Sequence, residues 1–162
     1  MEYQLGTTDI KAALDTLAKQ HERIGRALEQ VGYPEERRRE HSFETLARIV
    51  VGQQVSVAAA TSINKKLVTA LGGQLTATEV LNASDERLRS AGLSRQKVTY
   101  IQSLATAEAT GSLVLDSLPE LTDDDAASVI TRIKGFGEWS AHMYLMFSLG
   151  RPDIWPVGDL AV

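Results

Sequence analysis

Apolar residues recur along most of the chain at the three- and four-residue spacing that is typical of amphipathic helices. Serine or threonine residues that can cap a helix precede several of these segments, and glycines follow some of them. No segment shows the strict alternation of a β-strand. The pattern predicts an all-α fold with helices over residues 8–32, 42–51, 56–71, 78–82, 84–91, 94–105, 125–133 and 139–147, and it leaves open whether the first helix breaks near Gln20.

The last two predicted helices are joined by a short turn that contains two glycines. Gly135 and Gly137 flank one bulky residue, Phe136, which suits a turn that needs a positive φ or a close neighbour. The backbone amides of such a turn, at the start of a helix, can bind a phosphate oxygen without any lysine or arginine. The sequence therefore predicts a hairpin able to hold a phosphate.

A single carboxylate, Asp159, follows this hairpin in the segment Trp155–Asp159 (WPVGD). A proline and a glycine precede it, so we expect a loop that turns into a new helix at this point. Asp159 is then either a functional carboxylate or an N-cap for a helix that starts at Leu160. The two roles are compatible, because a capping carboxylate has a second oxygen.

The composition excludes several classes of site and protein. The 162 residues contain no cysteine, which rules out disulfides, thiolate zinc sites and a cysteine-held iron–sulfur cluster. No run of about eighteen apolar residues indicates a membrane span, and the N-terminus lacks the apolar core of a signal peptide, so we expect a cytoplasmic protein. The net charge of −4 argues against a broad, non-specific DNA binder. A protein that holds DNA through backbone amides and a few local cations does not need a basic surface overall.

Four stretches together resemble the helix-hairpin-helix DNA glycosylase superfamily, and within it the DNA-3-methyladenine glycosylase II group. They are Ile133–Ala141, Trp155–Asp159, Phe43–Ala60 and Gly92–Ala105. The absence of cysteine separates the chain from the endonuclease III branch. The resemblance implies two helical lobes with the active-site cleft between them. It divides the chain into an N-terminal helical segment (1–41), a lobe that carries a DNA wedge (42–118), and the hairpin with the catalytic loop (119–162).

The activity implied by this resemblance is base-excision repair of damaged double-stranded DNA. A monofunctional glycosylase would flip out an alkylated purine of the 3-methyladenine type and hydrolyse its N-glycosidic bond. Asp159 matches the carboxylate that stabilises positive charge on the sugar and orients or deprotonates the attacking water. Trp139 stands where bifunctional members carry a nucleophilic lysine. Because tryptophan cannot form a Schiff base, we expect no strand cleavage.

The resemblance also implies a pocket for the damaged base. The indole of Trp139 offers a π face to a positively charged alkylated purine, with core packing as its alternative role. Met143 lies one helical turn further, where a related enzyme type has an aromatic residue. Tyr144 and Trp155 are secondary candidates for this pocket.

Further residues match DNA and ion contacts of the superfamily. Gln54 matches the wedge that fills the gap left by the extruded base, with Gln53 beside it; alternatively, both glutamines bond to their own corner. Lys97 either faces DNA or is solvated. The other expected DNA contacts are Ser94, Lys134, Gly135, Phe136 and Gly137. The main-chain carbonyls of Thr131, Ile133 and Phe136 are expected to hold a sodium or potassium ion, with no cofactor required.

Only three residues follow Asp159, whereas in similar proteins a helix continues from this point and further helices complete the lobe. We therefore expect either a C-terminally truncated chain or a partner chain that supplies the missing packing. A monomer is expected, and a dimer could form through the surface that those helices would cover. Two alternatives to the enzyme stay open: a non-catalytic DNA-binding module and an inactive fragment.

Overall fold

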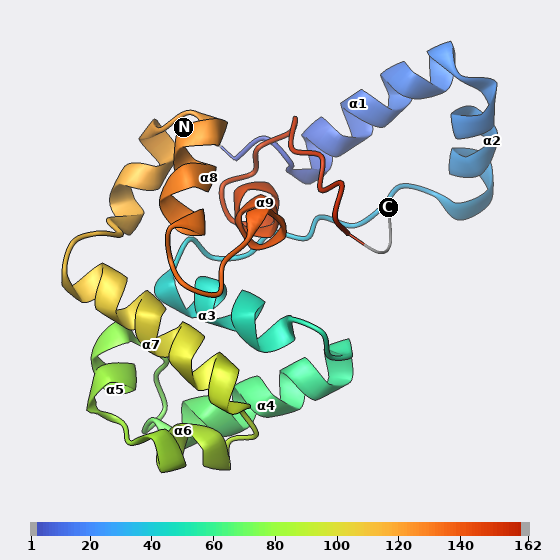
Figure 1. The fold of residues 1–162 in the computed structure, drawn as a ribbon. Helices are drawn as coiled ribbons and strands as arrows, with labels where there is room; N and C mark the ends of the chain where they lie inside the picture. The colour runs from blue at the N-terminus through green and yellow to red at the C-terminus, as the bar shows by residue number, and fades with distance from the viewer. Residues whose placement is uncertain (1–2, 160–162) are drawn as a thin grey trace.

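The computed structural model describes residues 3–159, and within this range it contains helices and loops but no β-strand (Figure 1). The prediction of an all-α fold is therefore confirmed. The helices are α1 (Thr7–Gln20), α2 (Glu22–Val31), α3 (Phe43–Gly52), α4 (Val57–Ala70), α5 (Ala77–Asn82), α6 (Asp85–Ser90), α7 (Arg95–Ala109), the 3-10 helix η1 (Leu115–Glu120), α8 (Asp123–Thr131) and α9 (Glu138–Phe147).

Local side-chain capping sets the start of most of these helices. In α3 to α8, a serine or threonine side chain accepts a hydrogen bond from the backbone amide three residues further along. The capping residues are Ser42, Ser56, Thr76, Ser84, Ser94 and Thr122. The segment predicted as residues 8–32 forms two helices, because His21 takes an extended conformation (φ −133°, ψ 102°) and interrupts it.

The helices form two groups that meet at α3 (Figure 1). Helices α4 to α7 lie on one side, and η1, α8 and α9 lie on the other. Helix α3 packs against α4 and α7 in the first group and against α9 in the second. Its residues Leu46, Val50 and Val51 have no exposed surface, and burying each such side chain stabilises the fold by about 1.5–3 kcal/mol.

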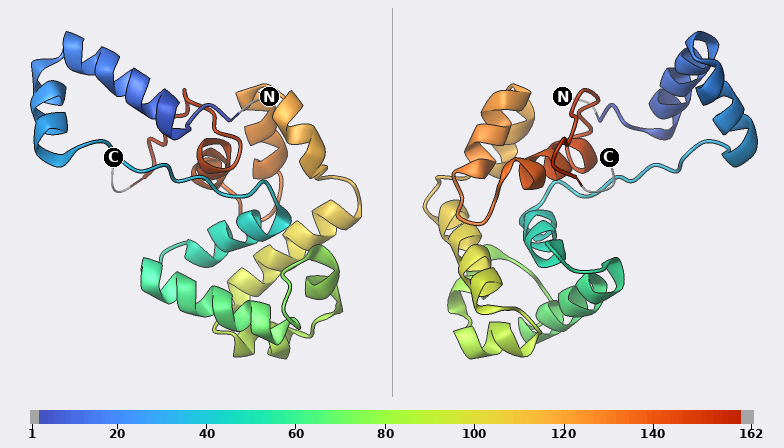
Figure 2. Two further views of the ribbon diagram at one scale, coloured as in Figure 1. Left: turned by 180° about the vertical axis from the view of Figure 1, so that it is seen from behind. Right: turned by 45° about the vertical axis from the view of Figure 1, so that its right-hand side comes forward.

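Helices α1 and α2 form a hairpin that projects from the rest of the molecule (Figure 2). They pack against each other, and neither contains a fully buried residue. The segments on either side of the hairpin are tied to the body through backbone hydrogen bonds from Gln4 N–H to the Gly150 carbonyl (3.1 Å) and from Arg39 N–H to the Phe147 carbonyl (2.7 Å). No helix in the described part of the chain has the length and apolar character needed to cross a membrane.

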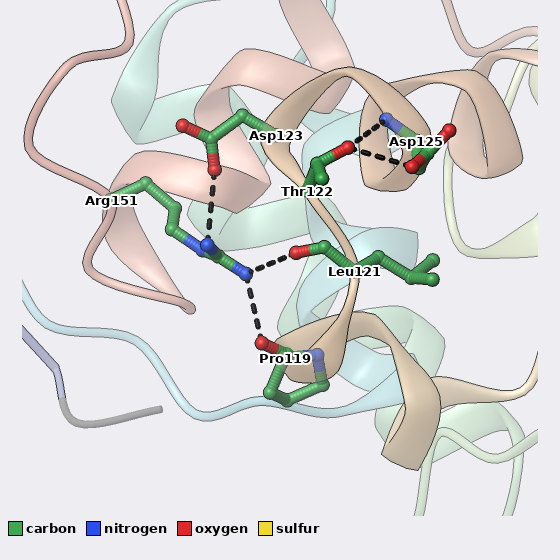
Figure 3. Close-up of polar contacts among 6 residues, drawn as sticks. All are labelled: Pro119, Leu121, Thr122, Asp123, Asp125 and Arg151. Carbon is green, nitrogen blue, oxygen red and sulfur yellow. Dashed lines mark hydrogen bonds and ion pairs between the residues drawn. The ribbon is translucent and has the colours of Figure 1, made fainter.

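Arg151 fastens the loop after α9 to the start of α8 (Figure 3). Its side chain is buried, and Nη2 donates to the carbonyls of Pro119 and Leu121, each at 2.9 Å. Nη1 lies 3.2 Å from Asp123 Oδ1. Asp123 therefore serves as an ion-pair partner in addition to its favourable position at the positive end of the α8 dipole. The anchored loop leads directly into the segment that carries Asp159.

Candidate active site

The hairpin lies where the sequence predicts it, between α8 and α9. Gly135 has φ +95°, and a Cβ atom built there would lie 2.1–2.5 Å from ring atoms of Tyr100. Glycine is therefore required both by the left-handed backbone and by the aromatic ring beneath it. Phe136 is 4% exposed and anchors the turn in the core. The side chain of Phe136 is thus not available to a ligand.

The start of α9 leaves backbone amides for a ligand. Its N-cap is Gly137, and no side chain accepts a hydrogen bond there. The first-turn amides of a helix have no intrahelical partner, so they form an anion-binding site when no side chain caps them. Lys134 is exposed on the same turn and adds a local positive charge.

Two of the three carbonyls expected to hold an ion belong to residues with bonds inside the hairpin. The Ile133 carbonyl accepts from Phe136 N–H at 3.0 Å, and a carbonyl oxygen retains a second lone pair. Thr131 is the last residue of α8, and its hydroxyl donates to the Ala127 carbonyl at 2.9 Å. Among the described residues, no group of three or more histidine and acidic side chains is arranged to bind a metal.

Asp159 lies beside Trp139, the first aromatic residue of α9. The indole Nε1–H donates to Asp159 Oδ2 at 2.9 Å, and Asp159 N–H donates to the Pro156 carbonyl at 2.9 Å. Both residues are partly buried. One hydrogen bond thus orients the carboxylate from α9, and the turn at Pro156 fixes its backbone. Whether Asp159 caps a helix concerns residues 160–162, which lie outside the described part of the chain.

The four residues expected in the base pocket separate into different environments. Met143 is partly exposed one turn after Trp139, and the Trp155 side chain is 70% exposed. Tyr144 has no exposed surface and therefore does not line an open pocket, contrary to the prediction from the sequence. Each helical residue is rotated by about 100° from the one before it, which turns Tyr144 away from the Trp139–Met143 face and into the core.

Tyr144 instead belongs to a buried hydrogen-bond chain. Its hydroxyl lies 2.8 Å from His41 Nδ1, and His41 Nε2 lies 2.9 Å from the Leu115 carbonyl. A carbonyl only accepts, so His41 donates to the Leu115 carbonyl from Nε2. Burial raises the pKa of Tyr144 well above its usual value. These bonds join α9 to His41, which precedes the N-cap of α3, and to the start of η1.

The two glutamines at the α3–α4 corner have different roles. Gln54 is exposed and has φ +55°, the one positive φ of a non-glycine residue among residues 3–159. Gln53 points inward, and its Nε2 donates to the Gly135 carbonyl at 2.9 Å and to Ser140 Oγ at 3.1 Å. The side chain of Gln53 thus bonds to the hairpin and to α9 rather than to its own corner.

The ammonium group of Lys97 is bonded within the protein and is not simply solvated. Its Nζ donates to the Val51 carbonyl at 2.7 Å and to the Gln53 carbonyl at 2.9 Å, at the C-terminal end of α3. A cation at this end satisfies carbonyls that have no helical partner. Partial burial lowers the pKa of Lys97. Ser94 is exposed and caps α7 by accepting from Lys97 N–H at 3.2 Å.

Two concave regions of the surface lie elsewhere. One, of about 160 Å³, is lined in part by Tyr3, Arg38 and Arg151. The other, of about 720 Å³, lies between α7 and α8 and includes Lys134 at its edge. Neither is lined by Asp159 or Trp139.

Comparison with known proteins places this geometry in a family. Residues 47–162 match the family model described as HhH-GPD superfamily base excision DNA repair protein. DNA-3-methyladenine glycosylase 1 of Schizosaccharomyces pombe is 32% identical over 123 residues, which cover 74% of this chain and 54% of that protein. DNA-3-methyladenine glycosylase of Saccharomyces cerevisiae is 32% identical over 132 residues, which cover 76% of this chain and 45% of that protein. The chain thus spans about half the length of these relatives.

Solved structures show the same arrangement of helices. The Schizosaccharomyces pombe 3-methyladenine DNA glycosylase in complex with abasic DNA superposes with a TM-score of 0.85 at 31% identity, covering 93% of this chain and 76% of that one. The DNA-3-methyladenine glycosidase of Bacillus halodurans gives a TM-score of 0.79 at 33% identity, covering 91% and 68%. The resemblance to the 3-methyladenine group is therefore confirmed, and the chain belongs to the HhH-GPD superfamily of base excision DNA repair proteins.

Proposed function

We propose that this chain forms the catalytic part of a monofunctional DNA glycosylase that removes alkylated purines of the 3-methyladenine type from double-stranded DNA. The observation that carries the proposal is the hydrogen bond of 2.9 Å from the Trp139 indole to the Asp159 carboxylate. It holds a carboxylate at the start of the helix whose amides would bind the DNA backbone. Relatives named DNA-3-methyladenine glycosylase support the substrate class.

Asp159 is the group that acts on the sugar. As the bond between the base and C1′ breaks, positive charge builds on the sugar ring, and a fixed carboxylate beside it lowers the energy of that state. Water then adds to C1′ and gives a proton to the carboxylate, which leaves a free base and an abasic site. The indole N–H holds the carboxylate in one orientation, because it donates a hydrogen bond to Oδ2.

Trp139 limits the reaction to hydrolysis. Its indole has no amine that could attack C1′, so no Schiff base forms and the DNA strand stays intact. The π face of the ring attracts a cationic base by about 0.5–2 kcal/mol. Alkylation at N3 or N7 gives a purine that positive charge, and it also weakens the bond to the sugar.

DNA is held by the hairpin and opened by Gln54. The amides of Gly137 and the first turn of α9 donate to a phosphate oxygen, with Lys134 beside them. The main-chain carbonyls of Thr131, Ile133 and Phe136 would hold a sodium or potassium ion, which would add positive charge to this contact. Gln54 enters the base stack, and the exposed Val55 and Val57 flank it (38% and 84% exposed). Because few cations take part, the affinity should depend only weakly on salt concentration.

The test uses methylated duplex DNA that is incubated with the protein and then heated in alkali, which breaks the strand at abasic sites. We expect breaks only after the alkali step, and we expect them to vanish in Asp159→Asn. Asp153→Asn is the matched control, because Asp153 is an exposed aspartate of the same loop. Equal amounts of strand breakage with the wild type and with Asp159→Asn would refute the role of Asp159. DNA binding without base release by the wild type would favour the non-catalytic binding module.

A further inference from the structure

The corner that carries Gln54 is bonded directly to the hairpin, although the two are far apart in the sequence. Gln53 Nε2 donates to the Gly135 carbonyl at 2.9 Å across a separation of 82 residues, and to Ser140 Oγ at 3.1 Å in the first turn of α9. Ser140 is 2% exposed and Gln53 is half-buried, so this contact is partly shielded from solvent. One side-chain amide therefore connects the turn between α3 and α4 to the turn between α8 and α9.

Helix α7 supports both turns from the same side. Lys97 bonds to the Val51 and Gln53 carbonyls at 2.7 and 2.9 Å. Tyr100 lies three residues further on the same helical face and packs its ring against Gly135. The α3–α4 corner and the hairpin thus contact neighbouring residues of α7, and the Gln53 side chain connects the corner to the hairpin.

The backbone of Gln54 needs this support. Its φ of +55° is a conformation that residues with a Cβ atom rarely adopt, and it persists only where the surroundings determine it. The residue immediately before it is held at its carbonyl by Lys97 and at its side chain by the hairpin. Gln54 itself is exposed, so the conformation is imposed from the adjacent Gln53 rather than by packing of Gln54.

We propose that Gln53 and Lys97 are positioning residues that hold the wedge Gln54 at a fixed distance from the phosphate-binding hairpin. This inference rests on the proposed function, because it concerns the two elements that would touch DNA. A hairpin seated on a phosphate then places Gln54 at one defined step of the base stack. Neither Gln53 nor Lys97 contacts DNA in this arrangement. Loss of either side chain leaves the hairpin able to bind a phosphate, but Gln54 no longer has a fixed position relative to it.

The test measures wedge insertion without relying on bond cleavage. Duplex DNA carrying a tetrahydrofuran abasic analogue next to 2-aminopurine reports unstacking through its fluorescence. Wild type and Asp159→Asn should give the same increase, and Gln54→Ala should remove it. Gln53→Leu should remove most of it in the wild type and nothing further in the Gln54→Ala background. A full fluorescence increase with Gln53→Leu, or no increase with the wild type, would overturn the proposal.

Conservative variants separate positioning from a general loss of structure. Lys97→Arg should keep the fluorescence increase because it retains a donor for the two carbonyls, whereas Lys97→Met should lose it. Ser140→Ala removes only the longer of the two Gln53 bonds and should give a partial loss. Gln74→Leu and Lys19→Met make the same chemical changes at exposed positions and should have no effect. Equal signals from Lys97→Arg and Lys97→Met would contradict the role of Lys97.

Base release measured on the same variants distinguishes a failure of the glycosylase function from a failure of the positioning role of Gln53 and Lys97. Under single-turnover conditions with saturating protein, Gln53→Leu should slow release by about 10- to 100-fold, since a small misplacement of a reacting geometry has effects of this size. The affinity for undamaged duplex should change little. A wild type that shows the fluorescence pattern but releases no base would refute the glycosylase function and leave the positioning intact. Base release by the wild type together with a full fluorescence increase in Gln53→Leu would support the glycosylase function and refute the positioning role.

Discussion

At the residue scale, Trp139 combines two properties that act on different partners. Its indole nitrogen holds Asp159 at 2.9 Å across a separation of 20 residues, and its partly exposed ring offers a π face. The hydrogen bond orients the carboxylate, whereas in the proposed reaction the ring would attract the cationic base. A substitution that removes only the N–H can therefore measure the first property while it preserves most of the second.

Trp139→Phe should lower the single-turnover rate of base release by about 10-fold. A hydrogen bond to a charged group contributes about 1.5–3 kcal/mol, and partial exposure of this site favours the lower end of that range. The rate is measured on methylated duplex DNA with saturating protein. Trp155→Phe is the control, because Trp155 is 70% exposed and should tolerate the change. An unchanged rate in Trp139→Phe would mean that the indole N–H does not orient Asp159.

Gln54→Gly should stabilise the fold while it removes the wedge. A left-handed conformation costs a residue with a Cβ atom about 1–2 kcal/mol, and part of this gain is offset by the greater freedom of glycine in the unfolded chain. We expect a net increase of about 0.5–1 kcal/mol in the free energy of unfolding, measured in urea. Gln53→Gly has no such strain to relieve (φ −58°) and should be destabilising. A less stable Gln54→Gly would show that φ +55° is not strained.

At the element scale, the hairpin depends on α7 as well as on its own two helices. Gly135 lies against the Tyr100 ring and its carbonyl accepts from Gln53, while Phe136 is buried beneath the turn. The turn is thus held from below and from the side. Its exposed groups, the amides at the start of α9, are left without a capping side chain.

Gly135→Ala should destabilise the protein by at least about 2 kcal/mol, because it combines steric overlap with conformational strain. The added Cβ would lie 2.1 Å from a Tyr100 ring atom in a left-handed backbone. Gly137→Ala provides the matched control, because Gly137 has φ −96° and nothing lies within 4 Å of the place that an added Cβ would occupy. Urea unfolding compares the two. Similar decreases in the free energy of unfolding in both variants would show that the Tyr100 contact does not constrain the turn.

At the scale of the whole molecule, buried polar side chains join segments that are distant in the sequence. Arg151 connects the loop after α9 to residues 119–123, and the His41–Tyr144 pair connects α9 to the start of α3 and to η1. Each contact fixes a segment that leads to the candidate site. The position of Asp159 therefore depends on residues that lie well away from it.

Arg151→Met should reduce the free energy of unfolding by about 2–4 kcal/mol. Two buried carbonyls lose their donor and Asp123 loses its ion pair, while the apolar part of the side chain is kept. Base release should fall as well, since the loop before Asp159 loses its anchor. Thermal and urea unfolding measure the first effect. Arg132→Met, at an exposed arginine, is expected to have little effect on either. A fully active and stable Arg151→Met would contradict the anchoring role.

The sequence by itself determined the features that depend on neighbours along the chain. Capping residues such as Ser42 and Ser94 mark where helices begin, because the bond they form spans only three residues. The hairpin was predictable for the same reason, since Gly135 and Gly137 signal a tight turn whatever surrounds them. The break at His21 was not predictable, because the residues on both sides favour a helix equally.

Only the tertiary structure decided which polar side chains meet. Lys97 and Gln53 resembled exposed DNA contacts, yet they bond to backbone carbonyls and to a hydroxyl brought near by the packing of α3, α7 and α9. Tyr144 directly follows Met143 in α9, and the side of α9 that faces the core decides which of the two is buried. Periodicity gives the relative orientation of residues on a helix, but the partner of each face is chosen by contacts between distant segments.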